Sequence, residues 1–495
     1  MRQVRDRIRL DHFLGGQMDR QLQRLFALLI TLALVAAACG NSGDEPVADE
    51  SDTGGSETTD DTTSTTAAPD IADPGPDDPD PDDPSALDRD TFVSIEGVPG
   101  VSDEEIAVAV LGLREGNPLG TCILDCYLTG IEAYFNFQNS LGGVFGRQLV
   151  VDDVVDDELF QHQPKALQII AGEDAIAVFS ASLTSSGLTD LDDAGVPTYN
   201  WGIQAPLNNG GFNLFPHLGV LCATCTGRAV PYQMSLAGAT TAVSLGYGVS
   251  PESQSCAQNN TAAIELYGDD LGISLAKTYD NLEFGLNNGV APQVTEWIEL
   301  GVDFVASCLD LNGMKTIAEE LVRQGARDQI TMQHPNTYDA GFVAEAGDLF
   351  NGDFVSAQFT PFEFTDHPAI VLYNEWVGPH GGPTAEQTMI GWMNAMLFVD
   401  GLLATGPVFD QASIVETTNT EFTAYTYGGI AGPLDWSRQH ESASDDDRVT
   451  HGATEECTTL VQMQDGAFVK VTDEPWLCWP QEDRSWQDPV EKAFS

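Results

Sequence analysis

Apolar runs of strand length alternate with helix-like segments along most of this chain, and that alternation restricts the fold more than any other feature. The first run, IAVAVLGL at 106–113, is continuous, as in a strand that is covered on both faces. A helical pattern follows at 125–140 and places Leu128, Ile131 and Phe135 on one face. Because parallel strands need crossover helices of this kind, the pattern predicts βαβ units in an α/β fold.

The alternation occurs in two series, which predicts two lobes with one parallel sheet each. The first series has further strands at 147–155, 175–181 and 195–201 and a helix at 162–172. The second series has strands at 241–248, 303–310 and 329–334 and helices at 257–271 and 314–325. We therefore expect one Rossmann-like lobe followed by another.

The N-terminal segment is typical of an export signal. LFALLITLALVAAA at 25–38 contains one polar residue, follows two arginines, and is too short to cross a bilayer comfortably. The boundary AAAC, which ends at Cys39, resembles the lipobox of bacterial lipoproteins, whose Cys receives a diacylglycerol. We expect a lipoprotein signal peptide at 1–38 and lipidation of Cys39, with translation starting at Met1 or Met18; an ordinary secretory signal is the alternative.

Residues 39–90 have the composition of a tether. The stretch 41–90 carries 17 acidic residues, one basic residue and no aromatic residue. Such a segment cannot bury enough apolar surface to offset its ordering entropy, and its prolines and like charges favour extended conformations. We expect a disordered acidic spacer.

The net charge excludes two classes of partner. The chain has 76 acidic and 20 basic residues, a formal net charge of −56. An excess of this size repels phosphate backbones and anionic headgroups. We therefore expect no nucleic-acid partner, and contact with a membrane through the lipid anchor only.

Several motifs are shared with one known family. They are EEIAVAVLGL, GIEAYFNFQNSLGGVFGRQLVVDDVVDD at 130–157, Gly195-Val196-Pro197, GLLATG at 401–406 and GPLDWSRQH at 432–440. In their order and spacing they resemble the type I periplasmic binding proteins, which include the branched-chain amino-acid-binding proteins of ABC transporters. The resemblance spans roughly 100–480 and implies two α/β lobes, joined by crossover hinge strands, that hold ligand in the cleft between them.

The expected division of the chain follows this fold. It assigns 100–235 plus about 361–435 to lobe 1, 236–360 plus about 436–480 to lobe 2, and 481–495 to a C-terminal tail.

Candidate ligand contacts follow from strand order, because ligands of open parallel sheets bind at the carboxyl ends of strands. The loops at those ends offer Arg114, Glu115, Ser185, Ser186, Trp201, Gly202 and Gln204 in the first series, and Ser255, His334, Asn336 and Tyr338 in the second.

The resemblance suggests roles for some of these residues. It implies that Ser185, Ser186, Gly202 and Gln204 hold a ligand carboxylate. His334 and Asn336 stand where amino-acid binders place an acidic residue for the ammonium, and Arg114 and Glu115 are substitute charge partners. The competing interpretations are that the two serines cap the next helix and that Arg114 and Glu115 are solvated loop.

The cysteines predict disulfides, since an even number remains after Cys39 in an exported chain. The eight are Cys122, Cys126, Cys222, Cys225, Cys256, Cys308, Cys457 and Cys478. Proximity in sequence favours Cys122–Cys126 and Cys222–Cys225. Cys256 and Cys308 can meet because they follow neighbouring strands of the second series, and Cys457–Cys478 would then join the C-terminal segment; this set is a preference among about 105 possible sets. A redox role for CATC at 222–225, or a zinc site with His217, is the alternative; we expect no metal and no cofactor.

The sequence favours binding over catalysis. It contains no nucleophile elbow, zincin, Walker or dinucleotide motif, and His440 in WSRQH is expected to be structural. We expect a monomeric, extracytoplasmic solute-binding lipoprotein of an ABC importer, anchored to the outer face of the cell membrane. It would deliver a branched-chain amino acid, a related amide or a small organic acid to a permease. A sensory receptor of the same fold is the alternative, and an extracellular hydrolase is a third hypothesis.

Overall fold

The fold is taken from a computed structural model. It describes residues 89–203, 210–219, 226–335, 337–380, 382, 384–441, 455–481 and 483–495. The chain divides into two units, 1–76 and 77–495, and every described residue belongs to the second unit. The predicted signal peptide, Cys39 and most of the predicted tether therefore lie outside the described residues.

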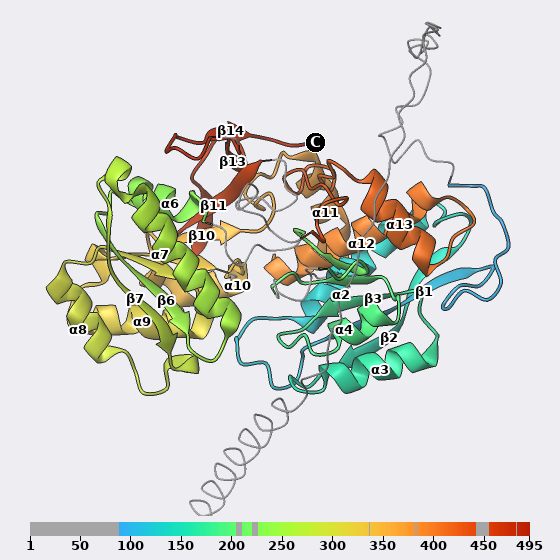
Figure 1. The fold of residues 1–495 in the computed structure, drawn as a ribbon, viewed down its shortest axis with the longest axis horizontal. Coiled ribbons are helices and arrows are strands. Elements are labelled where there is room, and N and C mark those ends of the chain that lie inside the picture. Colours follow the sequence, from blue (N-terminus) through green and yellow to red (C-terminus); the bar gives the residue numbers. More distant parts are fainter. Residues whose placement is uncertain are drawn as a thin grey trace, which may run out of the picture. The chain divides into compact units, whose positions relative to one another are not determined.

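The first sheet has five parallel strands in the order β2-β1-β3-β4-β5. Figure 1 labels β1, β2 and β3 of this sheet. Its strands are β1 Glu105–Gly112, β2 Gln148–Asp156, β3 Ala177–Ala181, β4 Thr198–Asn200 and β5 Leu214–Pro216. Consecutive residues of a strand point to opposite faces. In β1, Ile106, Val108 and Val110 belong to one core cluster, whereas Ala109 and Leu111 belong to another. The first sheet is therefore covered on both faces.

Helices from two parts of the chain cover the first sheet. They are α2 Leu124–Ser140, α3 His162–Gly172, α4 Leu188–Asp193, α11 Pro368–Val377, α12 Glu386–Thr405 and α13 Gln411–Glu421. Residues of α3 and α4 share the cluster of Ala109 and Leu111. Residues of α2 and α12 share the cluster of Ile106 and Val108. We call the first sheet with these helices the first lobe.

Helix α12 is the central helix of this lobe. It is 20 residues long and apolar enough to cross a membrane by length and composition, but 83% of its apolar window is buried in the protein. It crosses α2 at two glycines: a Cβ atom on Gly130 would lie 1.9 Å from the carbonyl oxygen of Thr388, and one on Gly391 would lie 2.1 Å from that of Tyr127. The two backbones therefore touch where no side chain fits.

The second sheet is mixed, in the order β14-β13-β11-β10-β9-β8-β6-β7, with β12 paired to β11. Its strands are β6 Thr241–Tyr247, β7 Ser274–Leu282, β8 Phe304–Ser307, β9 Thr331–Pro335, β10 Phe354–Ala357, β11 Glu456–Gln464, β12 Ala467–Lys470, β13 Trp476–Trp479 and β14 Val490–Lys492. Strands β6 to β10 pair in parallel, and β11 to β14 add antiparallel pairs. Strand β14 falls in the segment expected to be a tail.

The second sheet also carries helices on both faces (Figure 1). They are α6 Ala229–Ala237, α7 Pro251–Leu271, α8 Ala291–Leu300, α9 Leu311–Gln324 and α10 Ala340–Ala346, with short 3₁₀ turns η2 Phe284–Leu286, η3 Arg327–Gln329, η4 Gly347–Phe350 and, between α11 and α12, η5 Gly378–His380. Asp310 is the N-cap of α9, and its carboxylate accepts hydrogen bonds from the backbone N–H groups of Asn312 and Gly313. This second lobe completes the predicted α/β architecture of two lobes, which is confirmed.

Three disulfides join cysteines that proximity favours. They are Cys122–Cys126, Cys256–Cys308 and Cys457–Cys478. The expected partners Cys222 and Cys225 lie outside the described residues.

Arg147 fixes the segment that precedes β1. The side chain is fully buried. Its Nε atom donates to the carbonyl of Ser102 at 2.6 Å and Nη2 donates to that of Val93 at 2.7 Å. The guanidinium also lies over the ring of Phe92, 4.7 Å from its centroid. The entry to the folded unit is therefore tied to the first lobe.

Candidate functional site

Polar residues from both sheets meet where β4, β5, β9 and β10 end. Trp201 directly follows β4 and is 2% exposed, and its backbone N–H donates to Ser180 in the neighbouring strand at 2.8 Å. The indole Nε1 has no hydrogen-bond partner among the described residues. A buried donor without a partner costs about 1–3 kcal/mol, so a bound molecule that accepted this hydrogen bond would be stabilised.

Gly202 and His217 connect the ends of β4 and β5. The backbone N–H of Gly202 donates to His217 Nδ1 at 3.1 Å. Glycine is required at this place, since a Cβ atom would lie 2.7 Å from the Cβ of Pro216. Because Nδ1 accepts a hydrogen bond, the proton of the neutral ring is on Nε2. Burial lowers the pKa of His217 to about 4, which keeps the ring neutral.

The same imidazole links the two lobes. His217 Nε2 lies 2.5 Å from Oε1 of Gln358, which follows β10 in the second sheet. The Gln358 amide then donates from Nε2 to Oε1 of Glu386 at 3.0 Å. These hydrogen bonds form a series that runs from Gly202 through His217 and Gln358 to Glu386, and each hydrogen bond fixes the orientation of the next donor. We call this series the interlobe chain.

Glu386 is the first residue of α12 and ends the interlobe chain. Its backbone N–H donates to the carbonyl of Tyr338 at 2.9 Å, and its side chain is buried. Burial raises the pKa of Glu386 to about 8, against a hydrogen bond with the Tyr338 backbone that lowers it and with a smaller raising contribution from the charge of Asp339. The carboxyl is therefore neutral at pH 7, and its Oε2 atom has no partner in the described part of the chain.

Residues after β9 complete the polar set. Thr337 is buried and its Oγ1 has no hydrogen-bond partner within the described ranges. The Tyr338 hydroxyl donates to the Glu363 carboxylate and accepts from the backbone N–H of Phe362, the latter at 2.8 Å. This second bond holds the tyrosine ring against the segment that returns to the first lobe.

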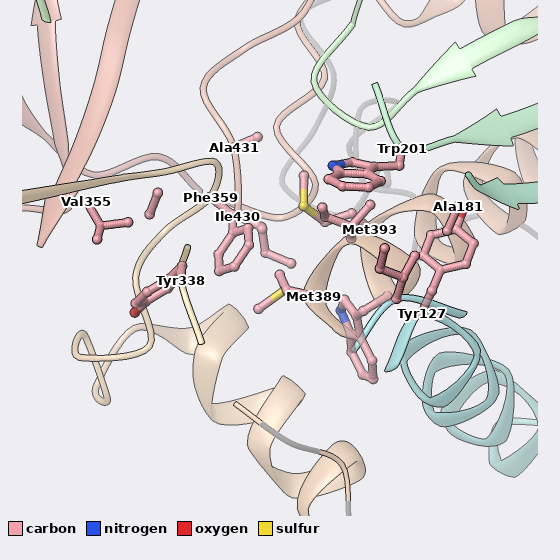
Figure 2. Packing of buried hydrophobic residues seen from close by; sticks show 14 of the residues in the cluster. Tyr127, Ala181, Trp201, Tyr338, Val355, Phe359, Met389, Met393, Ile430 and Ala431 are labelled. Carbon is pink, nitrogen blue, oxygen red and sulfur yellow. The ribbon is translucent and has the colours of Figure 1, made fainter. Parts of the chain in front are cut away.

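Apolar side chains surround these polar atoms. Figure 2 shows Trp201, Phe359, Met389, Met393 and Ile430 lying together between the ends of the two sheets. They come from the end of β4, the segment after β10, helix α12 and the loop after α13. A mainly apolar surrounding with a few polar atoms is the usual composition of a small-molecule site.

Arg114 and Glu115 form their hydrogen bonds with other residues of the first lobe. Arg114 is exposed and forms an ion pair with Asp125 at 2.6 Å. The backbone N–H groups of Arg114 and Glu115 donate to the Asp156 carboxylate at 3.1 and 2.9 Å.

Ser185 and Ser186 lie in the turn before α4. Ser185 is half-buried and Ser186 is exposed. Helix α4 begins after Gly187 without a side-chain cap. The alternative that these serines cap the next helix is therefore wrong, and their hydroxyls are not used at that helix end.

Two candidates of the second lobe, His334 and Ser255, do not lie in loops at the cleft. His334 is fully buried and its Nε2 lies 2.9 Å from Asp353 Oδ2, which also pairs with Arg327 at 2.7 Å. Ser255 is inside α7, which begins at Pro251 rather than at 257. Gln204 and Asn336 lie outside the described residues.

The sequence does not single out three residues of this candidate site: Gln358, Glu386 and Thr337. His217 was considered only as a zinc ligand, but both of its ring nitrogens form hydrogen bonds. His440 is buried, and its Nε2 lies 3.1 Å from Asn419 Oδ1, which is a structural contact as expected. Among the described residues, Glu455, Cys457 and Cys478 lie close enough together to hold a metal ion, but the two cysteines form a disulfide.

Comparison with known proteins gives a family and a fold. A family model described as periplasmic binding protein matches residues 106–467. No curated protein sequence matches the chain.

Similar solved structures include a solute-binding protein of an ABC transporter from R. palustris in complex with benzoate, with 17% identity, a TM-score of 0.56, and coverage of 79% of this chain and 98% of that one. They also include a branched-chain amino acid ABC transporter protein from Thermus thermophilus with bound valine, with 16% identity, a TM-score of 0.57, and coverage of 79% and 97%. A fatty acid ABC transporter substrate-binding protein from Thermomonospora curvata has 16% identity, a TM-score of 0.57, and coverage of 81% and 95%. At these identities the likeness establishes the fold.

Proposed function

Because the chain belongs to the periplasmic binding protein family, we propose that it is an extracytoplasmic solute-binding protein that captures a small molecule between its two lobes. One observation carries the proposal: Trp201 Nε1 from the first lobe, Thr337 Oγ1 after β9 and Glu386 Oε2 at the start of α12 are buried polar atoms without partners among the described residues. Buried polar groups are normally paired, so these atoms are suited to a bound polar ligand.

Capture proceeds by closure of the lobes about the segments that connect them. The cargo docks on the loops of one lobe and gains contacts from the other, and this differential affinity shifts the population to the closed state. In this proposal, the hydrogen bond between His217 and Gln358, which joins the two sheets, is one of the contacts of the closed arrangement.

The cargo is a small organic molecule, and the closed protein delivers it to an ABC permease. Proteins of similar fold are described with benzoate, with valine and as fatty-acid binders. The proposed range for this chain is branched-chain amino acids, related amides and small organic acids. The protein acts as a monomer, since one chain supplies residues from both sides of the site.

The protein is held at the outer face of the membrane through Cys39, with residues 39–90 as the spacer. The AAAC boundary supports this part of the proposal. It is tested by separating cells that produce the Cys39→Ala variant into membrane and soluble fractions. Release of the variant from the membrane is expected, and retention would contradict lipid anchoring.

The binding proposal is tested with a thermal-shift and calorimetric screen of benzoate, valine, leucine and decanoate. Saturation at a hundredfold excess over Kd stabilises a protein by about 2.7 kcal/mol. Trp201→Phe keeps an aromatic ring but removes the Nε1 donor, so the affinity for the best probe should fall about tenfold. Trp392→Phe is the matched control, because Trp392 is buried among α2, α11 and α12 and its Nε1 is also unpartnered in the described residues. Equal affinities of the two variants would contradict this placement of the site.

A further inference from the structure

The order of the described elements takes the chain between the two lobes three times. Connection one, 217–228, runs from β5 to α6; connection two, 358–367, runs from β10 to α11; connection three, 422–455, runs from α13 to β11. The structure describes all of connection two, and of the others it describes 217–219, 226–228, 422–441 and 455. A movement of one lobe against the other changes backbone angles in such connections, because the packed lobes themselves deform little.

Residues 476–495, which we call the hinge brace, contact all three connections. At connection one, Arg484 Nη2 donates a hydrogen bond to the carbonyl of Thr226 at 2.7 Å. In the opposite direction, Nη1 of the buried Arg228 donates to the carbonyl of Pro480 at 3.3 Å. One arginine on each side therefore ties connection one to the hinge brace.

At connection two, the hinge brace forms two further hydrogen bonds. Trp476 Nε1 donates to Oγ1 of Thr360 at 3.0 Å, and both side chains are buried. Nε2 of His367, the N-cap of α11, lies 3.2 Å from the carbonyl oxygen of Phe494, which accepts the hydrogen bond. Figure 1 shows the chain leaving β14 in the second lobe and ending near α11. The hinge brace thus reaches from the second sheet to the start of a first-lobe helix.

At connection three, the hinge brace lies against backbone in an uncommon conformation. Tyr427, Gly428 and Gly429 have successive positive φ angles of 54°, 62° and 90°. A tyrosine in this conformation persists only where its surroundings hold it, whereas the two glycines allow the turn to change its angles easily. The carbonyl oxygen of Phe494 covers Gly429 so closely that a Cβ atom there would lie 2.3 Å from it. The hinge brace therefore holds the turn of connection three that is best able to move.

The hinge brace is itself fixed to the second lobe. Strand β13 pairs with β11, β14 pairs with β13, and the Cys457–Cys478 disulfide joins the first of these pairs. The match to the family model ends at residue 467, so the hinge brace lies beyond the matched part of the chain. Its contacts with the connections are thus a feature of this chain and not of the matched region.

Connections one and two begin at His217 and Gln358, whose side chains form the hydrogen bond between the lobes. Resting on the proposed function, we propose that the hinge brace holds the three connections in the arrangement in which these side chains meet, and that it slows the opening of the lobes that releases cargo. Contacts that are stronger in one arrangement shift the population towards it. A loosened hinge brace lowers the closed fraction of the free protein, and the apparent affinity for cargo falls with that fraction.

Two tryptophans of the hinge brace provide a matched test. Trp476→Phe keeps an aromatic ring and removes the hydrogen bond to Thr360. Trp479→Phe is the control, because Trp479 is also buried but its Nε1 donates to the carbonyl of Gln487, inside the hinge brace, at 2.9 Å. In stopped-flow experiments with the tightest-binding probe among benzoate, valine, leucine and decanoate, dissociation should be about fivefold faster for Trp476→Phe, with a change of less than about twofold for the control.

A second measurement needs no ligand. Spin labels introduced as unnatural amino acids at Leu167 in α3 and Ile298 in α8, which are both exposed, report the distance between the lobes of the free protein. A combined variant with Trp476→Phe, Arg484→Ala and Phe494→Ala removes one side-chain contact at each connection. Its distance distribution should be broader than that of the unaltered protein, whereas the Trp479→Phe control should leave the distribution unchanged.

The outcomes distinguish this inference from the proposed function. An unchanged distance distribution in the combined variant would overturn the inference, as would equal dissociation rates for the two tryptophan variants, and either result leaves the solute-binding function standing. Failure of every probe to bind would count against the proposed function, while the distance measurement still tests the hinge brace. If the combined variant does not fold, Arg484→Ala alone is measured in the same way and should also broaden the distribution.

Discussion

His217 and Gln358 are 141 residues apart in sequence, and their side chains meet at 2.5 Å, where β5 of the first sheet and β10 of the second sheet end. This contact is a side-chain hydrogen bond between the two lobes. Its donor is fixed from the other side, because Gly202 donates to the second nitrogen of the same ring.

Replacing His217 should weaken ligand binding as well as the fold. His217→Ala removes the hydrogen bonds that the imidazole forms with Gln358 and with the Gly202 N–H, so the free energy of unfolding should fall by about 2–3 kcal/mol. Affinity for the cargo should fall about tenfold, because the closed arrangement loses a contact between the lobes. Chemical denaturation and calorimetry measure the two effects.

His162 provides the control for that prediction. It is also buried, accepts from the backbone N–H of Gly187 at 2.9 Å and contacts Ser180 at 3.2 Å, but all of these groups belong to the first lobe. His162→Ala should cost similar stability and leave the affinity for the cargo unchanged. An equal loss of affinity in both variants would show that His217 acts through folding alone.

Stability should depend on pH through Glu386. Its pKa is about 8 in the folded protein and near 4.5 in the unfolded chain. The folded state therefore holds a proton that the unfolded state has released, and stability is lost as the pH rises towards 8, by up to about 1.4 kcal/mol per pH unit. Glu386→Gln should remove this slope between pH 6.5 and 8.

Other groups contribute equally to the protein and to the variant. His162 and His217 have pKa values of about 4 in the folded protein, so their contributions are lost as the pH falls towards and below 6.5, and this loss is common to both proteins. Asp400, with a pKa of about 6, also titrates below the window. Denaturant unfolding at pH 6.5, 7.25 and 8 measures the slope, and an unchanged slope in the variant would assign it to a different group.

The crossing of α2 and α12 should not tolerate a methyl group. Gly130→Ala and Gly391→Ala place a Cβ within about 2 Å of a carbonyl oxygen on the facing helix, so each should lower the free energy of unfolding by about 3 kcal/mol or more. Gly378→Ala is the control, because Gly378 has a helical φ of −57° and nothing lies within 4 Å of its Cβ position. Thermal unfolding of the three variants compares the stability loss at Gly130 and Gly391 with that at Gly378. Equal losses in all three would show that α2 and α12 can move apart at no cost.

The contribution of each disulfide to the free energy of unfolding should increase with the length of the loop that it closes. Cys256 and Cys308 are separated by 52 residues, whereas Cys122 and Cys126 are separated by 4. Loop-closure entropy then predicts a loss of about 4 kcal/mol for Cys256→Ser with Cys308→Ser, and about 2 kcal/mol for the shorter pair. Denaturation of the two double variants under oxidising conditions gives the comparison. A larger loss from the short loop would show that native-state packing outweighs chain entropy.

The parallel core could be predicted from sequence because its strands are covered on both faces. The run at 106–113 became β1 Glu105–Gly112, and the run at 241–248 became β6 Thr241–Tyr247. The sequence does not indicate strand β7, since it lies at the edge of its sheet and mixes exposed residues with half-buried ones. An edge strand has a weaker apolar signal than a central one.

The candidate site was harder to predict for a topological reason. Trp201 and Tyr338 stand next to strands that apolar runs reveal, so strand order alone points to them. Gln358 and Glu386 are single polar residues with no local pattern, and only the return of the chain to the first lobe brings them together. His334 has the right place in sequence, but its Nε2 lies 2.9 Å from Asp353, and a buried hydrogen bond of that kind leaves no periodic signal.

The Arg147 guanidinium determines where mechanical force enters the protein. It holds the carbonyls of Val93 and Ser102, so a pull on the chain at residue 89 is borne by the first lobe before it reaches β1. If residues 39–90 attach the protein to a surface as proposed, we expect the first lobe to be held by that attachment and the second lobe to move relative to it during closure.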